Sequence, residues 1–185
     1  INLFQNERNL GPVANWNCAL RRATGKFVGL LNHDDLYGPS WLAFAVYVLE
    51  KYTHVGWVAT AFRIVDDKGQ TLGVESRFAR TRQYNPSEAF PRVARLDGLG
   101  PGYIVRRRIL EEIGYYDEDA GPSADNELFL RLASKYPLYY STWPQTAWRL
   151  HSGNLTHRWG PVQQTIDSLR ILDKVFGSDN LPEEL

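Results

Sequence analysis

The pattern of apolar and polar residues along the chain predicts its secondary structure. Residues 26–32 (KFVGLLN) are a short continuous apolar run, typical of a strand covered on both faces, and we expect this strand at the centre of a sheet. Residues 55–78 contain two strand-like runs joined by a turn at 67–69, so part of the sheet should be antiparallel. Further strands are expected at residues 1–4, at 102–105 and within 138–150.

Helical spacing of apolar residues predicts the remaining elements. Helices are expected near residues 12–23, 39–52, 107–114, 124–135 and 161–176. Pro39 would occupy the first helical position of the second helix, where its missing N–H costs nothing. Strands alternating with helices, together with one hairpin, indicate a layered α/β domain with a mixed sheet. With 185 residues the chain matches one domain, 1–185, in which 160–185 form a carboxyl-terminal helix and tail.

Composition narrows the class of protein. Lysine plus arginine and aspartate plus glutamate both number 21, so no global field attracts nucleic acid or a membrane surface. The only cysteine, Cys18, excludes an internal disulfide and fits a reducing compartment. The sequence contains no transmembrane segment and no secretory signal. We therefore expect a cytoplasmic protein, either free or peripheral at the inner face of the membrane.

One stretch, residues 77–108, is locally basic, with eight arginines against only Glu88 and Asp97. A nucleic-acid surface is disfavoured because aromatic residues do not alternate with these arginines as they do on a stacking platform. The alternative is that the arginines meet a phosphorylated or lipid-linked acceptor, for which Arg80 and Arg82 are the candidates.

Two adjacent carboxylates, Asp34 and Asp35, follow the apolar run at 26–32. In an open α/β sheet, ligands bind beyond the carboxyl ends of the strands, and carboxylate pairs suit Mg²⁺ or Mn²⁺. A role as helix caps is weakened because Pro39 puts the helix start several residues later, whereas a role in a turn stays open.

Two further segments carry candidate chemistry. Asp125 lies in the first turn of the helix expected at 124–135, on its inward side, and could face a cleft; alternatively, Ser123 or Asp125 itself could cap the helix. His151 follows a strand-like run and could complete a metal site or contact a phosphate, although a buried histidine with a satisfied hydrogen bond is the simpler alternative. Some of the six tryptophans could form a sugar-stacking platform, but most should belong to the core.

Four segments in this order resemble glycosyltransferase family 2. They are RNLGPVANWNCALRRATGKFVGLLNHDDLYGPSWL, GYIVRRRILEEIGYYDED, SADNELFLRLA and WRLHSGN. The resemblance extends from about residue 2 to 157. It implies the nucleotide-diphospho-sugar transferase fold called GT-A: a three-layer αβα sandwich around a mixed, mostly parallel sheet.

The resemblance also implies roles for individual residues. Asp35 would bind the metal, Mg²⁺ or Mn²⁺, and Asp34 would lie against the ribose or share the metal. Asn32 stands where the family's Asp-x-Asp pattern has its first acid. Asp125 would be the catalytic base, ionised at neutral pH with the help of its helix N-terminus. His151 matches a position that approaches the metal or the phosphates.

The implied activity is an inverting, metal-dependent transfer from a nucleotide-sugar donor to a carbohydrate or lipid-linked acceptor, as in cell wall or polysaccharide biosynthesis. The segment GLGPGY (98–103) would line the acceptor side. The usual amino-terminal nucleotide-binding strands have no counterpart in this chain, so we expect an amino-terminally truncated domain. The sheet edge exposed in this way could pair with a second copy to form a homodimer. The rival interpretation is a noncatalytic module that binds carbohydrate or phosphate without turnover.

Overall fold

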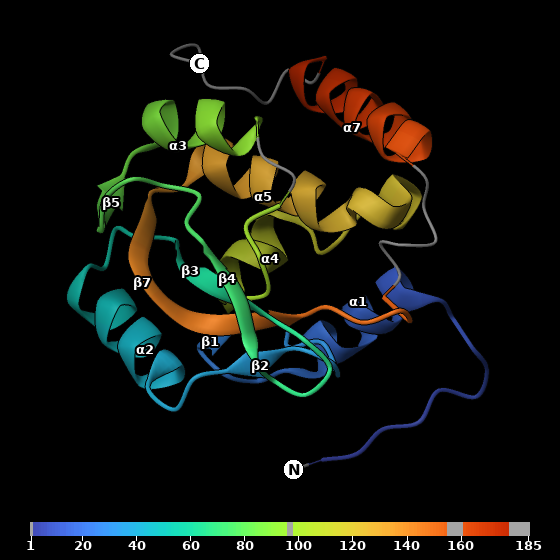
Figure 1. The fold of residues 1–185 in the computed structure, drawn as a ribbon. Helices are drawn as coiled ribbons and strands as arrows, with labels where there is room; N and C mark the ends of the chain where they lie inside the picture. The colour runs from blue at the N-terminus through green and yellow to red at the C-terminus, as the bar shows by residue number, and fades with distance from the viewer. Residues whose placement is uncertain (1, 96–97, 155–160, 178–185) are drawn as a thin grey trace.

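The computed structural model describes residues 2–95, 98–154 and 161–177 (Figure 1). Its strands are β1 (Phe27–Val28), β2 (Leu36–Tyr37), β3 (Trp57–Val65), β4 (Thr71–Glu75), β5 (Arg82–Tyr84), β6 (Tyr103–Arg106) and β7 (Leu138–Arg149). Its helices are α1 (Pro12–Arg22), α2 (Trp41–Lys51), α3 (Pro86–Val93), α4 (Arg107–Ile113), the 3₁₀ helix η1 (Glu118–Ser123), α5 (Ala124–Lys135) and α7 (Pro161–Phe176). None of these helices has the length and apolar character needed to cross a bilayer.

The strands form one mixed sheet in the order β1-β6-β3-β7-β2, with β4 beside β3 and β5 beside β7. The predicted α/β architecture and the hairpin of β3 with β4 are confirmed. The expected majority of parallel neighbours is wrong, because β3 and β7 are the one parallel pair among the described strands. Alternation of strands and helices in the sequence does not fix strand direction when a connection crosses to the opposite end of the sheet.

Helices cover both faces of the sheet. Successive residues of a strand point to opposite faces, so one strand contributes to the core on each side. On β3, Trp57 and Ala59 join the larger apolar core, which packs against α1, α3, α4, α5 and α7. Val58 between them joins a smaller core against α2. In Figure 1, α2 lies on one side of the sheet, and α3 and α5 lie on the other. The three predicted layers are therefore present.

The strand at 26–32 does not lie at the centre of the sheet. Only Phe27 and Val28 form strand pairs, with β6 alone, and β1 stands at the end of the strand order. The central position belongs to β3, a nine-residue strand. The prediction failed because an apolar run does not specify which strands pair: Val28 is buried, whereas Leu31 in the same run is 46% exposed. The strand expected at 1–4 is also absent from the described residues 2–4, and Leu3 is 93% exposed.

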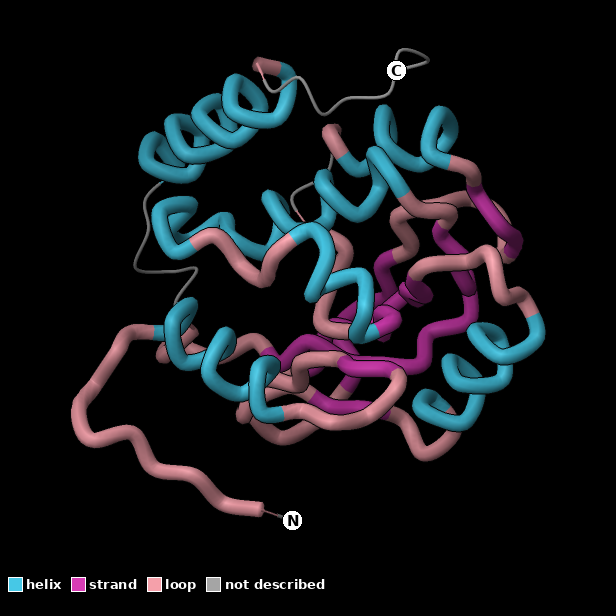
Figure 2. Tube along the Cα trace, turned by 180° about the vertical axis from the view of Figure 1, so that it is seen from behind, coloured by secondary structure: helices cyan, strands magenta, loops and turns pink. Residues whose placement is uncertain are grey.

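The predicted helices form, with differences at their ends. α2 begins at Trp41 with Ser40 at the N-cap, so Pro39 precedes the helix rather than opening it. The sequence analysis missed α3 altogether, although Asn85 and Glu88 form a capping box at its start. The carboxyl-terminal helix is α7, which lies at the upper left in Figure 2, on the same side of the sheet as α3 and α5 and farther from it.

Candidate active site

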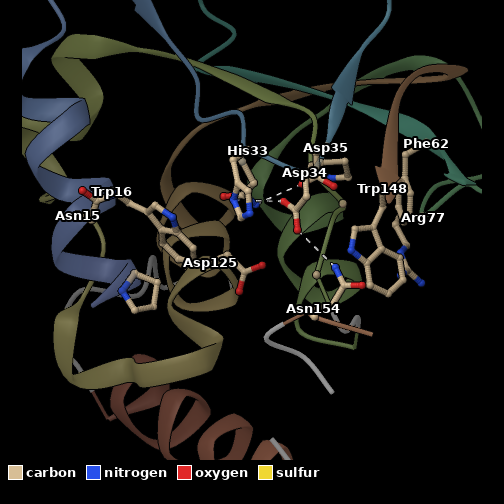
Figure 3. Close-up of a pocket in the computed structure, with 16 residues that line it drawn as sticks. Asn15, Trp16, His33, Asp34, Asp35, Phe62, Arg77, Asp125, Trp148 and Asn154 are labelled. Atoms are coloured by element: carbon tan, nitrogen blue, oxygen red, sulfur yellow. Dashed lines mark hydrogen bonds and ion pairs between the residues drawn. The ribbon is translucent and has the colours of Figure 1, made fainter. Parts of the chain in front are cut away.

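A cavity of about 440 Å³ opens where β1, β3 and β7 end. These three strands point in the same direction, because β1 and β3 are both antiparallel to β6 and β7 is parallel to β3. Their carboxyl ends therefore meet at one edge, the usual place for a ligand in an α/β sheet. Asn32, Asp34, Asp35 and Asp125 all line this cavity. Figure 3 shows that Asp34 and Asp125 face the same space although they lie far apart in the sequence.

Asp35 is the more deeply buried of the adjacent pair, with 8% of its surface exposed. Its Oδ1 accepts a hydrogen bond from the backbone N–H of Arg149 (3.2 Å), and its Oδ2 accepts one from Asn32 Nδ2 (3.2 Å). Burial nevertheless raises the pKa of Asp35 to about 6, since these two bonds only partly compensate for lost hydration and the neighbouring Asp34 charge acts in the same direction as burial. Asn32, which replaces an acid in this pattern, therefore orients Asp35.

The Asp34 carboxylate forms hydrogen bonds with His151 and Asn154. Its Oδ2 lies 3.1 Å from His151 Nε2 and 3.5 Å from Asn154 Nδ2. The backbone N–H of Gly153 donates to His151 Nδ1 (3.1 Å), so the neutral imidazole carries its proton on Nε2 and donates it to Asp34. His151 is not among the residues that line the cavity. Both of its ring nitrogens are engaged in this arrangement, and it acts on the cavity through Asp34.

Asp125 is the second residue of α5 and points into the cavity. Its Oδ1 accepts a hydrogen bond from the backbone N–H of Asn126 (2.9 Å), so it also satisfies the helix N-terminus. Burial raises the pKa of Asp125, and the backbone hydrogen bonds oppose this shift only in part. This shift opposes the effect of the helix N-terminus, and ionisation of Asp125 at neutral pH stays a prediction. A raised pKa suits a group that takes a proton near neutral pH.

The sequence analysis missed the residues that tie the acids together. Arg149 donates from Nε to the backbone carbonyl of Asp34 (3.0 Å) and from Nη1 to the carbonyls of Asp66 and Asp67 (3.1 Å each), which joins the site to the β3–β4 turn. Asn154 is 5% exposed, and its Oδ1 accepts from the backbone N–H of His151 (2.5 Å). The position of both residues within WRLHSGN was the one signal that could have identified them.

Aromatic side chains and one arginine complete the cavity. Trp16 lies to one side of Asp125 in Figure 3, and Trp148, Phe62 and Arg77 lie to the other. Of the other tryptophans, Trp41 and Trp57 are core residues, Trp143 is 73% exposed and Trp159 falls outside the described residues.

Arg80 and Arg82, the arginines first considered for an acceptor, do not line the cavity. Arg82 is engaged with Glu88, with its Nη2 2.7 Å from Glu88 Oε1. Arg77 is the member of the basic stretch that reaches the site.

The carboxylates at the cavity wall form part of a candidate metal site. No cluster of three histidine, cysteine or acidic side chains with metal-binding geometry exists within the described part of the chain. Asp34 and Asp35 supply two carboxylates at the cavity wall. Because Mg²⁺ commonly takes one or two carboxylates from a protein and further oxygens from substrate phosphates, this pair fits a metal that binds together with a diphosphate.

The family model described as glycosyl transferase family 2 matches residues 1–114. Among curated proteins, the chain is 28% identical over 131 residues to the uncharacterized glycosyltransferase YwdF of Bacillus subtilis, which covers 70% of this chain and 47% of that protein. It is 26% identical over 141 residues to the uncharacterized glycosyltransferase MJ1057 of Methanocaldococcus jannaschii. This match covers 74% of this chain and 46% of that protein. The chain thus spans about half the length of these relatives.

Two solved structures have a similar fold. The first is S. aureus TarS 1-349 in complex with UDP-GlcNAc, with a TM-score of 0.69 and 19% identity over 94% of this chain and 49% of that one. The second is the mannosyltransferase PcManGT from Pyrobaculum calidifontis in complex with GDP-Man and Mn²⁺, with a TM-score of 0.62 and 17% identity over 99% and 48%.

Proposed function

The chain belongs to glycosyltransferase family 2, and from this premise we propose that it transfers a sugar from a nucleotide-diphosphate donor to an acceptor hydroxyl with inversion. The observation that carries the proposal is the convergence of Asp34, Asp35 and Asp125 on one cavity from two distant segments. The similar structures are complexes with UDP-GlcNAc and GDP-Man, which supports a sugar nucleotide as donor. The acceptor is proposed to be a carbohydrate or a lipid-linked glycan.

In this proposal Asp125 is the catalytic base. The acceptor oxygen forms a bond to the anomeric carbon while the bond from that carbon to the diphosphate oxygen breaks, and the acceptor proton passes to the Asp125 carboxylate. The raised pKa of Asp125 favours this proton transfer. A positioned base of this kind contributes roughly 10²–10⁴ in rate.

Asp35 and Asp34 would hold the divalent cation, and His151 would keep Asp34 in position rather than contact the ligand itself. A bound Mg²⁺ or Mn²⁺ would act as a Lewis acid that neutralises charge on the leaving diphosphate. Asn32 orients Asp35 through its hydrogen bond to Oδ2.

The test is Asp125→Asn in the purified protein, assayed with several sugar nucleotides and Mn²⁺. We expect release of nucleoside diphosphate and sugar transfer to fall at least about a hundredfold, while the affinity for nucleoside diphosphate with Mn²⁺ changes little. The matched control is Asp119→Asn, an exposed acid of η1 outside the cavity. Equal loss of turnover and nucleotide affinity in Asp125→Asn would make Asp125 a structural residue.

The same assay tests the rival interpretation, a noncatalytic module that binds carbohydrate or phosphate without turnover. Nucleoside diphosphate and Mn²⁺ would then bind, but no sugar nucleotide would be turned over by the unmodified protein.

A further inference from the structure

The described residues that line the cavity include three aspartates but only one lysine or arginine, which is Arg77. It follows β4 and reaches the cavity from the side opposite Trp16, next to Trp148 (Figure 3). In the proposed function the charges of Asp34 and Asp35 are directed at a metal and a diphosphate. The positive charge of Arg77 has no role in that chemistry.

The guanidinium of Arg77 has few protein partners. Its Nη1 lies 3.5 Å from Glu75 Oε2, a long contact to a side chain that is 44% exposed. Its Nε is buried without a hydrogen-bond partner, and Nη2 has no acceptor among the described residues. The group stacks over Phe62 at 5.5 Å from the ring centroid. Phe62 therefore holds the guanidinium in place, and its terminal Nη1 and Nη2 groups, rather than the buried Nε, are the donors for a ligand.

A continuous wall leads from the proposed base to Arg77. A side-chain carbon at Gly98 would lie 3.7 Å from Asp125 Oδ2, and one at Gly100 would lie 2.3 Å from Cδ1 of Phe62. A side chain at Gly100 would overlap Phe62, so the backbone packs directly against that ring. Both glycines also have a positive φ (87° and 86°), a conformation that residues with side chains rarely adopt. The loop of Gly98 and Gly100 thus contacts Asp125 at one end and Phe62, over which Arg77 lies, at the other.

We propose that Arg77 binds an anionic group of the acceptor, so that the enzyme selects acceptors carrying a phosphate or a carboxylate near the reacting hydroxyl. This inference rests on the proposed function, because it takes Asp125 to mark the acceptor site. An anionic acceptor would otherwise be repelled by the three aspartates, and Arg77 offsets that repulsion where the acceptor extends away from them. The free donors of the guanidinium suit the bidentate contacts that arginine makes with phosphate and carboxylate.

The experiment measures binding of glucose, glucose 6-phosphate and glucuronate by calorimetry, in the presence of Mn²⁺ with UDP or GDP. The variants are Arg77→Gln, Arg77→Lys and Glu75→Gln, and the matched control is Arg80→Gln, a neighbouring arginine outside the cavity. Thermal unfolding of each variant establishes that it is folded. Affinity for UDP or GDP is measured separately, and donor hydrolysis is measured in the same preparations.

We expect an anionic sugar to bind at least about tenfold more tightly than glucose, the worth of one charge-assisted contact. Arg77→Gln should abolish this preference and leave glucose binding unchanged, Arg77→Lys should retain part of it, and Arg80→Gln should have no effect. Glu75→Gln should strengthen anion binding because it removes the competing carboxylate, a gain that a merely structural Arg77 would not produce. Preference for glucose 6-phosphate alone would assign a phosphate acceptor, and preference for both anions would assign a general anionic one.

The inference is overturned if glucose and both anionic sugars bind equally, or if Arg77→Gln and Arg80→Gln have the same effect. It is also overturned if Arg77→Gln lowers the affinity for UDP or GDP as much as the affinity for glucose 6-phosphate, since Arg77 would then belong to the donor site. Failure of the proposed function has a different signature: no donor is hydrolysed by the unmodified protein, whatever the sugar preference.

Discussion

At the scale of single residues, Asp35 predicts a dependence of stability on pH. Burial disfavours the carboxylate and raises the pKa of Asp35 from its ordinary value of 3.8 to about 6 in the folded chain. A raised acid pKa means that the folded chain binds more protons than the unfolded chain between about pH 4 and 6. The ionised group therefore destabilises the metal-free protein fully above pH 6, and this penalty disappears as the pH falls through that window.

Asp35→Asn should accordingly raise the free energy of unfolding by roughly 2–3 kcal/mol at pH 7 and have no effect below about pH 4. Urea unfolding of both forms across this range, without divalent metal, measures the difference. Because Asp125 also has a raised pKa and is present in both forms, its contribution cancels. A difference that does not vary with pH would contradict the assignment to ionisation of Asp35.

His151 predicts an effect on metal affinity that operates through another residue. Loss of the contact between Nε2 and Asp34 in His151→Ala should weaken Mn²⁺ binding in the presence of nucleoside diphosphate by roughly tenfold or more, the usual effect of removing the partner of a metal ligand. His151→Gln keeps an N–H donor and should restore part of the affinity. His54→Ala is the control, because His54 contacts Gln83 outside the cavity. An unchanged Mn²⁺ affinity in His151→Ala would show that Asp34 needs no such support.

Sequence motifs identified the acids of the cavity but not what surrounds them. Asp34, Asp35 and Asp125 lie in segments whose type and order are recognisable, and each is read from its own neighbours in the chain. Arg77 and Trp148 reach the cavity only because β4 and β7 lie on either side of β3, a pairing between distant segments that no local pattern encodes. The direction of the Asp125 pKa shift likewise depends on burial by the whole fold.

At the scale of elements, the connection from α4 to α5 depends on one buried ion pair. Glu127 is 2% exposed. Its Oε1 accepts a hydrogen bond from Arg131 Nε (2.7 Å), and its Oε2 accepts one from Arg131 Nη2 (2.6 Å). Arg131 also donates to the backbone carbonyls of Ile113, Gly114 and Tyr115, at the end of α4. The pair therefore joins the carboxyl end of one helix to the helix that carries Asp125.

Arg131→Met should destabilise the chain by about 3–5 kcal/mol, because it leaves the Glu127 carboxylate buried without a partner. The double variant Arg131→Met/Glu127→Gln should recover part of this loss. Arg107→Met, which removes a partly exposed pair with Glu111, should cost no more than about 1 kcal/mol. Denaturant unfolding measures all three, and equal losses in Arg131→Met and Arg107→Met would contradict a special role for the buried pair.

Element types were predicted more successfully than their arrangement. The helices α5 and α7 were predicted at the observed residues, because helical spacing of apolar side chains is a local property. The position of β1 at an end of the sheet could not be predicted, since strand order depends on which distant segments pair. α3 was predictable from its capping box and was missed because the charge of residues 77–108 was considered without regard to helix signals.

At the scale of the whole molecule, four strands pair with one neighbour only among the described strands, so each leaves an edge without a partner: β1, β2, β4 and β5. β2 and β5 are only two and three residues long. The outer edge of β1 is two residues long and is adjacent to Lys26, a charge that discourages pairing. The outer edge of β4 is five residues long, and its Leu72 and Val74 are 60% and 58% exposed. Homodimerisation through a sheet edge stays a prediction, and the structure favours β4 as that edge rather than β1.

We therefore expect the chain on its own to self-associate as its concentration rises, with β4 pairing against a second copy. Light scattering across a concentration series measures this, and Val74→Lys should shift the equilibrium towards monomer because a lysine charge at an edge opposes its own copy. Leu42→Lys is the control: Leu42 is similarly exposed (54%) but lies on α2, away from any strand edge. A monomer at high concentration would refute the prediction, and equal effects of the two lysines would assign the association to general apolar exposure instead of strand pairing.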